Sequence, residues 1–199
     1  MKAKPLLIMA GAFLLMGMVS LGALFLYEPV TSKEPLPVIG QAPSFSLTNS
    51  EGKTFDQSLM QGKVWVADFF FSSCAGPCPT MAANMGSLAR RFRKHPNVQF
   101  VSFSVDPETD NPEVLRKYAA KLNADTSRWH FLTGPNEAIG KLVDVEGFKL
   151  GSSESILAHS TRFVLVDSQG QIRGYYEGIE EAGVHTLARD IVRLQKEKK

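Results

Sequence analysis

Several features that define large protein classes are missing from this sequence of 199 residues. Neither sign of charge dominates, because 22 lysines and arginines face 20 aspartates and glutamates, and all are scattered along the chain. Nucleic-acid binding would need a basic face with interleaved aromatic residues, so the net charge of +2 argues against it. Internal repeats and low-complexity tracts are also absent. We therefore expect one domain of ordinary size plus a terminal segment.

Cysteine is scarce, since Cys74 and Cys78 are the only two in the chain. A structural disulfide between them would close a very small loop. The chain-entropy model gives it less than the roughly 3 kcal/mol expected for a loop of about 15 residues. A domain of this length buries a full core without such a crosslink. We therefore assign the cysteine pair a functional role and not a structural one. The spacing alone leaves both redox and metal-binding roles open.

One apolar run is unusually long. Residues Leu6 to Tyr27 carry no charge over 22 positions, and as a helix they would be about 33 Å long, enough to cross a bilayer. Lys2 and Lys4 precede the run, and the flank that follows it mixes both signs of charge. The positive-inside bias then predicts a cytoplasmic N-terminus and a domain on the extracytoplasmic, periplasmic side.

A cleaved signal peptide is the alternative interpretation of this run. Residues 20–22, Ser-Leu-Gly, would be a tolerable cleavage site. However, the run is longer than the core of about 7 to 15 residues that is typical of signal peptides. We expect an N-terminal membrane anchor over residues 1–28, a proline-containing linker over 29–39 and a folded domain over 40–199.

Strand-length apolar runs alternate with helix-spaced apolar residues in the predicted domain. The expected strands are 43–48 and 53–55, which form a β-hairpin, then 63–71, 98–105, 129–132, 161–167 and 171–176. The expected helices are 77–92, 110–122, with an Asp110 to Glu113 capping pattern, 135–143 and 180–195. This order predicts an α/β sandwich with a mixed sheet.

The two cysteines fall where the strand ending at Phe71 gives way to the helix containing Met81. A helix N-terminus offers unpaired N–H groups and a partial positive charge, which favour thiolate over thiol. If the loop winds as a first helical turn, residues four apart share one face. Cys74 and Cys78 would then be near enough for a disulfide or for joint ligation of one ion.

Three stretches resemble the SCO family, also called SenC, of copper chaperones for cytochrome c oxidase. They are VWVADFFFSSCAGPCPTMAANM, SFSVDPETDNPEVLRKYA and ILAHSTRFVLVDSQG. The most specific element is Cys-x-x-x-Cys-Pro at 74–79, followed later by the lone histidine His159. The resemblance implies a thioredoxin-like fold with an added N-terminal β-hairpin. It also implies that Cys74, Cys78 and His159 are the copper ligands.

His159 lies 81 residues after Cys78, so only the fold could bring its ring to the thiols. Taken alone, a lone histidine at a strand edge is more often a surface or hydrogen-bonded residue than a functional one. His95, His130 and His185 have no matching context, and we interpret them as surface or partly packed residues.

Copper(I) suits two soft thiolates, and an imidazole suits either oxidation state of copper. Zinc usually takes four ligands in a closed structural site, whereas three ligands fit a site built to release its ion. Together with the membrane anchor, the resemblance implies a membrane-tethered copper metallochaperone that delivers copper to the binuclear centre of cytochrome c oxidase. Its expected partners are the copper-bearing oxidase subunit, a copper donor and a thiol reductant.

A thiol-disulfide oxidoreductase is the second hypothesis, with Cys74 and Cys78 as its redox-active catalytic pair. It would keep the oxidase copper-site cysteines reduced, and the Gly-Pro between the two cysteines resembles that of thioredoxin active sites. His159 distinguishes the two functions, because a copper carrier needs its imidazole and dithiol exchange does not. A peroxidase-like domain is disfavoured, since no Thr and Arg arrangement accompanies Cys74.

Supporting residues carry weaker expectations. Asp68 either tunes the thiols and accepts protons or is a strand-edge aspartate bonded to backbone. The methionines at 81 and 85 would be core residues more often than thioether ligands of copper. Asp106 and Asp110 are explained by turn and capping roles. Residues 151–155 are expected to form a mobile surface loop that lets His159 swing on and off the metal.

Overall fold

The computed structural model describes residues 34–144, 147, 148, 150 and 160–197. The chain forms a compact unit from Leu36 to its C-terminus, distinct from the residues that precede it. The predicted membrane anchor over residues 1–28 lies outside the described residues. Among the residues that are described, no helix has the length and apolar character needed to cross a membrane.

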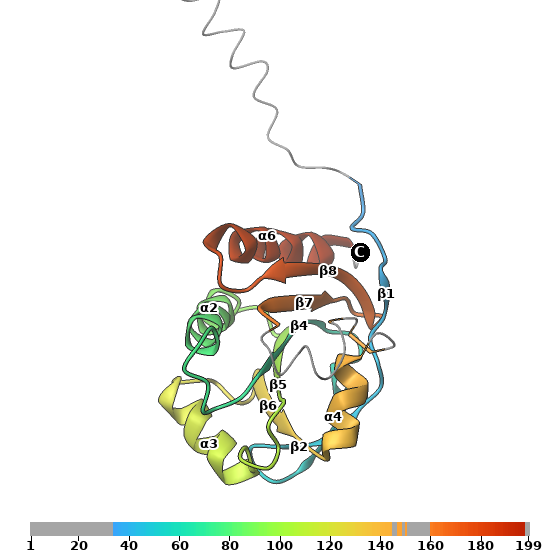
Figure 1. Cartoon of the computed structure of the whole chain (residues 1–199). Helices are drawn as coiled ribbons and strands as arrows, with labels where there is room; N and C mark the ends of the chain where they lie inside the picture. Colours follow the sequence, from blue (N-terminus) through green and yellow to red (C-terminus); the bar gives the residue numbers. More distant parts are fainter. Residues whose placement is uncertain (1–33, 145–146, 149, 151–159, 198–199) are drawn as a thin grey trace, which may run out of the picture. The chain divides into compact units, whose positions relative to one another are not determined.

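Eight strands of the described chain form a single mixed sheet (Figure 1). Its spatial order is β1-β8-β7-β4-β5-β6-β2-β3, in which β4, β5 and β6 are parallel and the other neighbours are antiparallel. The strands are β1 Gly40–Gln41, β2 Ser46–Asn49, β3 Thr54–Asp56, β4 Val64–Phe70, β5 Val98–Ser104, β6 Trp129–Thr133, β7 Arg162–Val166 and β8 Gln171–Glu177.

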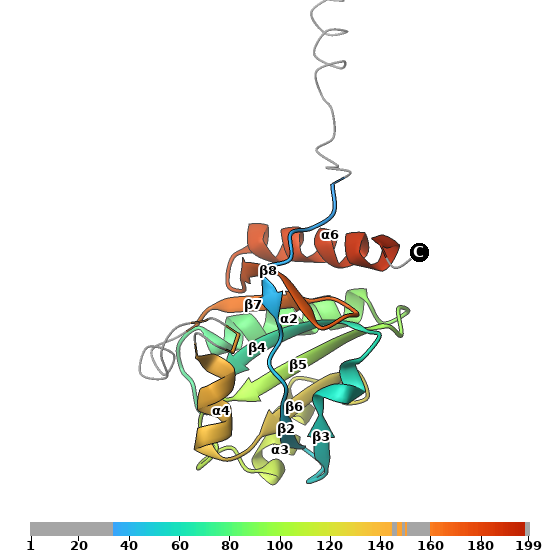
Figure 2. The same ribbon diagram turned by 90° about the vertical axis from the view of Figure 1, so that its right-hand side faces the viewer.

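In the part of the chain that the structure describes, four α-helices and one short 3-10 helix cover the sheet. They are η1 Gln57–Met60, α2 Cys78–Arg91, α3 Pro112–Lys121, α4 Asn136–Val143 and α6 Glu181–Glu197. Apolar residues of α2, α3 and α6 belong to one hydrophobic core, and those of α4 and η1 belong to a second. The helices therefore lie on both sides of the sheet (Figures 1 and 2), and the predicted α/β sandwich with a mixed sheet is confirmed.

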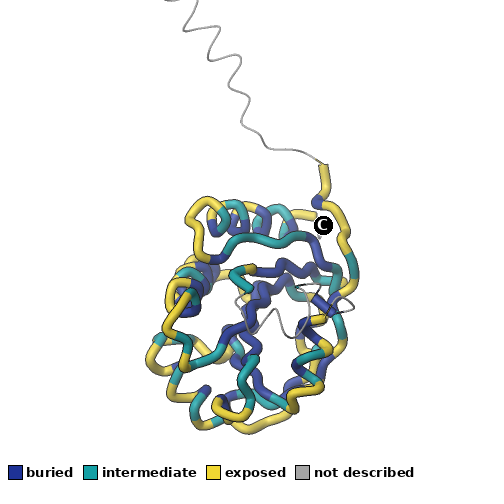
Figure 3. The backbone as a smooth tube through the Cα atoms, in the orientation of Figure 1, coloured by how far each residue is buried: buried dark blue, intermediate teal, exposed yellow. Residues whose placement is uncertain are grey.

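The central strands β4 and β5 are buried along their whole length (Figure 3). Side chains alternate along a strand, so β4 sends Val66 and Phe70 into the first core and Trp65 and Phe69 into the second. A strand buried on both faces must be almost wholly apolar, which explains why β4 is apolar at every position except Asp68. Among the described residues, all members of both cores come from Leu36 onward, so residues 36–199 contain the two cores.

The predicted N-terminal β-hairpin is present as β2 and β3, which pair antiparallel. The Asn49 side chain accepts hydrogen bonds from the backbone N–H groups of Glu51 at 3.0 Å and Lys53 at 2.9 Å. Gly52 takes a φ of 76°, a conformation that suits glycine. This local turn fixes the hairpin, and β2 then joins the sheet at β6.

The cap of α3 differs from the prediction. Asn111, and not Asp110, is the N-cap, because its side chain accepts from the N–H groups of Glu113 at 3.0 Å and Val114 at 3.1 Å. Pro112 occupies the first helical position, where its missing N–H costs nothing. The Asp110 carboxylate therefore does not cap the helix, and it makes hydrogen bonds at the candidate site instead.

Arg173 ties the start of the compact unit to its C-terminal helix. The buried guanidinium donates to the backbone carbonyls of Leu36 and Pro37, to Asp167 at 2.7 Å and to Glu197 at 2.9 Å. Removing one partner of a buried ion pair leaves the other charge without compensation. Arg173 is therefore expected to be a major contributor to stability.

Replacing Arg173 with methionine should lower the free energy of unfolding by about 3 to 5 kcal/mol, because Asp167 would remain buried without its partner. Urea unfolding of residues 36–199, followed by tryptophan fluorescence, measures this loss. Arg189→Met, at an exposed position of α6, is the matched control and should change stability by less than about 0.5 kcal/mol. Equal losses in both variants would contradict the assignment.

Candidate dithiol site

The two cysteines lie at the carboxyl end of β4, in the connection to α2. The Cys74 N–H donates to the Phe71 carbonyl at 3.2 Å, and Cys78 is the first residue of α2. Both thiols are free; Cys74 is partly buried and Cys78 is buried. The predicted position at a strand-to-helix junction is confirmed. No side chain caps this helix, and the N–H of Cys78, its first residue, donates to Cys74 in the cysteine loop.

The two thiols differ strongly in acidity. Burial opposes ionisation of Cys74, but hydrogen bonds from the Cys78 thiol and from the N–H groups of Cys78 and Gly76 lower its pKa below the ordinary value. Burial raises the pKa of Cys78 to about 12, helped by the hydrogen bond to Cys74 and by the negative charges of Cys74 and Asp68. Cys74 is therefore the thiol that ionises first and is open to solvent.

Cys74 should therefore be alkylated at least about 30-fold faster than Cys78 by iodoacetamide at neutral pH. The lowered pKa of Cys74 and the raised pKa of Cys78 give Cys74 the larger thiolate fraction, and the weaker nucleophilicity of a more acidic thiol offsets only part of that advantage. Peptide mapping by mass spectrometry measures both rates. In urea the two rates should converge; a difference that persists there, or none in the folded protein, would refute the proposed asymmetry.

Asp68 lies within β4 and is only 3% exposed. Its Oδ1 accepts from the Ser102 hydroxyl at 2.5 Å, and Ser102 accepts from the Trp129 indole N–H at 2.9 Å. Burial raises the pKa of Asp68 to about 7. Asp68 is thus neither at a strand edge nor bonded to backbone, which corrects that interpretation. Its charge raises the pKa of Cys78, as the tuning hypothesis expects.

Asp110 has a role that the sequence did not reveal. The fully buried carboxylate accepts from the Ser72 N–H at 3.0 Å, from the Ser72 hydroxyl, and from the Ser104 hydroxyl at 2.6 Å. It therefore joins the start of the cysteine loop to the end of β5. The turn and capping interpretation of Asp110 is wrong for its side chain. The sequence signal for this contact was a pair of serines at the ends of two neighbouring buried strands, Ser72 shortly after β4 and Ser104 at the end of β5.

Tyr118 of α3 is a second residue that sequence reasoning missed. Its ring stacks on Phe70 with centroids 5.1 Å apart and an interplanar angle of 19°. Burial raises the pKa of its hydroxyl far above the usual range, and the nearby negative charges of Asp68, Cys78, Asp110 and Cys74 raise it further. The phenol therefore stays protonated beside the thiols. The only sequence signal for Tyr118 was the helical spacing of α3, which puts this residue on the face of the helix that packs against the sheet.

The other candidate residues have structural roles. Met81 and Met85 are buried in the first core, so the core interpretation is confirmed. Asp106 forms the expected turn, because its carbonyl accepts from the Asp110 N–H at 2.8 Å. The ring of His130 packs against Phe55, with centroids 4.6 Å apart, and burial lowers its pKa to about 4. The other two non-candidate histidines, His95 and His185, are exposed.

His159 and the predicted loop 151–155 lie outside the described residues. The described chain resumes at Ser160, and β7 begins at Arg162. Because β7 runs antiparallel to β4, with Ala67 opposite Val164, its first residues lie at the carboxyl end of β4. The cysteine loop leaves the sheet at that same end. Within the described part of the chain, no three metal-ligating side chains are clustered.

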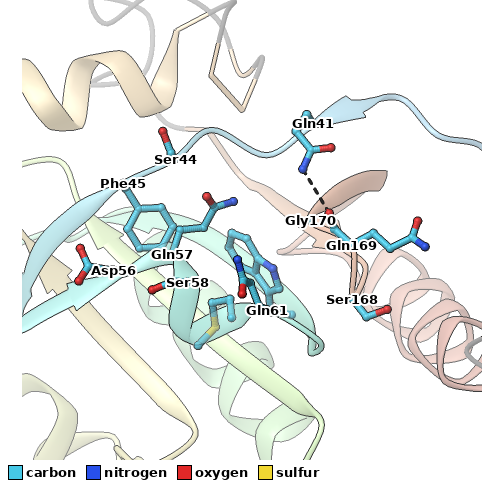
Figure 4. Close-up of a pocket in the computed structure, with 12 residues that line it drawn as sticks. Gln41, Ser44, Phe45, Asp56, Gln57, Ser58, Gln61, Ser168, Gln169 and Gly170 are labelled. Atoms are coloured by element: carbon cyan, nitrogen blue, oxygen red, sulfur yellow. Dashed lines mark hydrogen bonds between the residues drawn. The ribbon is translucent and has the colours of Figure 1, made fainter.

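A cavity of about 700 Å³ opens at the other end of β4 (Figure 4). Gln41, Gln57, Gln61 and Gln169 surround it, with Trp65 of β4 among its lining residues. The Gln41 amide donates to the Gln169 carbonyl at 3.2 Å. Since neither cysteine lines this cavity, it is separate from the candidate dithiol site.

Comparison with known proteins gives a consistent result. The SCO1/SenC family model matches residues 37–196. The SCO1 protein homolog of Bacillus subtilis is 32% identical over 169 residues, which cover 80% of this chain and 84% of that protein.

Two solved structures extend this similarity. BsSco, described as a member of the Sco family of cytochrome c oxidase assembly proteins with a disulfide switch, is 29% identical, with a TM-score of 0.71 over 81% of this chain and 97% of its own. Bradyrhizobium japonicum ScoI, solved with copper bound, shares the fold at 21% identity, with a TM-score of 0.61 over 77% of this chain and 99% of its own.

Proposed function

Because the chain belongs to the SCO1/SenC family, we propose that it is a copper metallochaperone acting in cytochrome c oxidase assembly. Copper is its cargo, held by the thiolates of Cys74 and Cys78 and by the imidazole of His159. The description of BsSco as a cytochrome c oxidase assembly protein and the copper bound to ScoI support this assignment. Copper then passes to the binuclear centre of the oxidase subunit.

The observation that carries the proposal is the pair of free thiols at the carboxyl end of β4. Two soft thiolate donors four residues apart fit Cu(I) better than a hard cation. The hydrogen bonds that lower the pKa of Cys74 favour its thiolate, the form that binds Cu(I). The chain also returns to this end of the sheet at Ser160, directly after His159, which makes the third ligand sterically reasonable.

Membrane tethering completes the proposal. The apolar run from Leu6 to Tyr27 would anchor the protein, with residues 29–39 as a linker and the domain on the periplasmic side. The tether would keep the carrier close to an oxidase subunit in the same membrane. A separate copper donor would load the site, and a thiol reductant would keep it open in an oxidising compartment.

A thiol-disulfide oxidoreductase remains the second candidate function, and one observation favours it. The accessible thiol has the lower pKa, and the buried thiol has the higher one. This is the order needed when Cys74 attacks a disulfide and Cys78 later displaces the partner from the mixed disulfide. The disulfide switch described for BsSco is in keeping with a pair that closes reversibly.

Anaerobic Cu(I) titration of reduced residues 36–199, against a calibrated chelator, tests the metallochaperone. One equivalent should bind, and Cys74→Ala or Cys78→Ala should each lose at least about 100-fold in affinity, because one soft ligand cannot replace two. Ser73→Ala, in the same loop, is the control and should bind like the wild type. Tighter binding of zinc than of Cu(I) by the wild-type protein would refute the proposal.

A further inference from the structure

The fold gathers basic residues that are scattered along the sequence. Helices α2, α3 and α6 each follow the carboxyl end of a strand, β4, β5 and β8, and these strands run in the same direction. All three helices therefore end near the amino ends of the strands, away from the cysteines (Figure 2). We call the exposed cations at these helix ends and in the turn after α2 the amino-end surface: Arg90, Arg91, Arg93, Lys94, Lys121 and Lys196.

Helix dipoles explain only part of this cluster. Cations in a last helical turn are favourable, which accounts for one or two per helix. However, Arg93 and Lys94 follow the end of α2, where Arg128 already donates to the carbonyls of Phe92 at 2.9 Å and Val98 at 2.8 Å, and to those of Arg93 and His95. The carbonyls at this helix end therefore need no further cation.

One carboxylate, that of Asp125, lines the same hollow as Arg90 and Arg93, but it forms no ion pair with them. None of the six cations of the amino-end surface has an ion pair within the described residues. Of the nearby acids, Glu197 is bonded to Arg173 and to the Leu36 N–H, and Asp125 to Ser127. At the opposite end, α3 and α6 begin with Glu113 and Glu181. Glu113 is ion-paired with Lys117, and Arg162 at the start of β7 is ion-paired with Glu177, so the cations of the amino-end surface differ from these in having no ion pair among the described residues.

The chain enters the compact unit close to this surface. The Leu36 N–H donates to Glu197 at 3.2 Å, and Glu197 is the neighbour of Lys196 in the last turn of α6. Only eight residues, 28–35, separate Leu36 from the apolar run that ends at Tyr27. Fully extended, they span at most about 28 Å. If that run crosses a membrane, as the proposed function assumes, the amino-end surface cannot move far from the bilayer.

We propose that the amino-end surface binds anionic lipid headgroups of the membrane that anchors the protein. Unpaired lysines and arginines close to an anionic bilayer each raise membrane affinity by roughly fivefold, provided that they lie within a Debye length of about 8 to 10 Å. Binding through this surface directs Cys74 and Cys78 away from the bilayer. The thiols are thereby presented to a partner domain that projects from the same membrane.

Sedimentation of residues 36–199 with vesicles tests this surface without the anchor. We expect the unit to bind vesicles with about a quarter phosphatidylglycerol at least about tenfold better than pure phosphatidylcholine, with the difference lost in about 0.5 M salt. The triple variant Arg91→Gln, Arg93→Gln, Lys94→Gln should lose at least about tenfold in binding to the anionic vesicles.

A matched variant removes the same charge elsewhere: Arg116→Gln, Lys117→Gln, Arg162→Gln. It should bind the anionic vesicles nearly as well as the wild type, because these residues lie on other parts of the unit. Equal losses in the two variants, or no preference for anionic vesicles, overturns the proposal. The absence of a preference for anionic vesicles is also the result expected if the surface recruits an acidic protein instead of lipid.

Copper titration separates this inference from the proposed function. The Arg91, Arg93 and Lys94 variant should bind Cu(I) like the wild type, since the surface and the thiols lie at opposite ends. Normal copper binding without vesicle binding overturns the surface alone. Vesicle binding by a wild-type unit that fails to bind copper overturns the metallochaperone alone.

Discussion

Replacing His159 with alanine is expected to lower the Cu(II) affinity of the protein by at least about 100-fold. Loss of an outer-shell partner of a metal ligand already costs about 10- to 100-fold, so loss of a ligand should cost more. The Cu(I) affinity should fall less, because both soft thiolates remain. In the wild type, affinity should also weaken as pH falls through about 6.5, where the imidazole becomes protonated. The variant should lack that step.

Thiol chemistry provides the control within the same variant. Disulfide exchange with a small disulfide should continue at the wild-type rate, because it uses only Cys74 and Cys78. His185→Ala, at an exposed position of α6, should leave both copper binding and exchange unchanged. Spectroscopic Cu(II) titration and stopped-flow exchange measure the two properties. If His159→Ala binds both oxidation states like the wild type, the three-ligand site is refuted and the oxidoreductase becomes the leading function.

The fold was predictable because its central elements have strong local patterns. β4 and β5 are mostly apolar, as strands buried on both faces usually are, and the helix after the cysteines shows clear amphipathic spacing. The hairpin was also predictable, since its turn depends on Asn49 and Gly52, which lie within a few residues of each other. Local chemistry of this kind is visible in a single sequence.

The surroundings of the thiols were harder to predict, because long-range contacts determine them. Asp110 bonds Ser72, which lies 38 residues earlier, and nothing local distinguishes it from a turn aspartate. Asn111 competes for the same capping role and takes it, since its neighbour Pro112 begins the helix. Tyr118 lies within electrostatic range of the thiols because α3 packs beside Phe70. Such contacts follow from topology and not from the pattern of one segment.

Asp68 should make the protein less stable as pH rises. The pKa of its carboxyl is about 7 when folded, against an ordinary value of 3.8, so the folded state holds this proton more tightly. Stability should therefore fall between about pH 4 and about pH 7 and then level off, with a total loss of roughly 4 kcal/mol as an upper estimate. Below that window the protonated carboxyl is compatible with its buried position.

Asp68→Asn should remove most of this pH dependence. The asparagine carbonyl can still accept from the Ser102 hydroxyl, so the contact at 2.5 Å has a neutral replacement. The variant should thus be more stable than the wild type at about pH 8 and similar at about pH 4, by urea unfolding at both values. Glu180→Gln, an exposed change of the same charge, should leave the wild-type pH dependence intact.

A second measurement distinguishes tuning of the thiols from a purely structural role of Asp68. The carboxylate raises the pKa of Cys78, so its removal should lower that pKa and speed alkylation of Cys78 at alkaline pH. Cys74 should change less, because its pKa is governed by hydrogen bonds from Cys78 and Gly76. An unchanged Cys78 rate in a folded Asp68→Asn protein would show that the carboxylate does not act on the thiols.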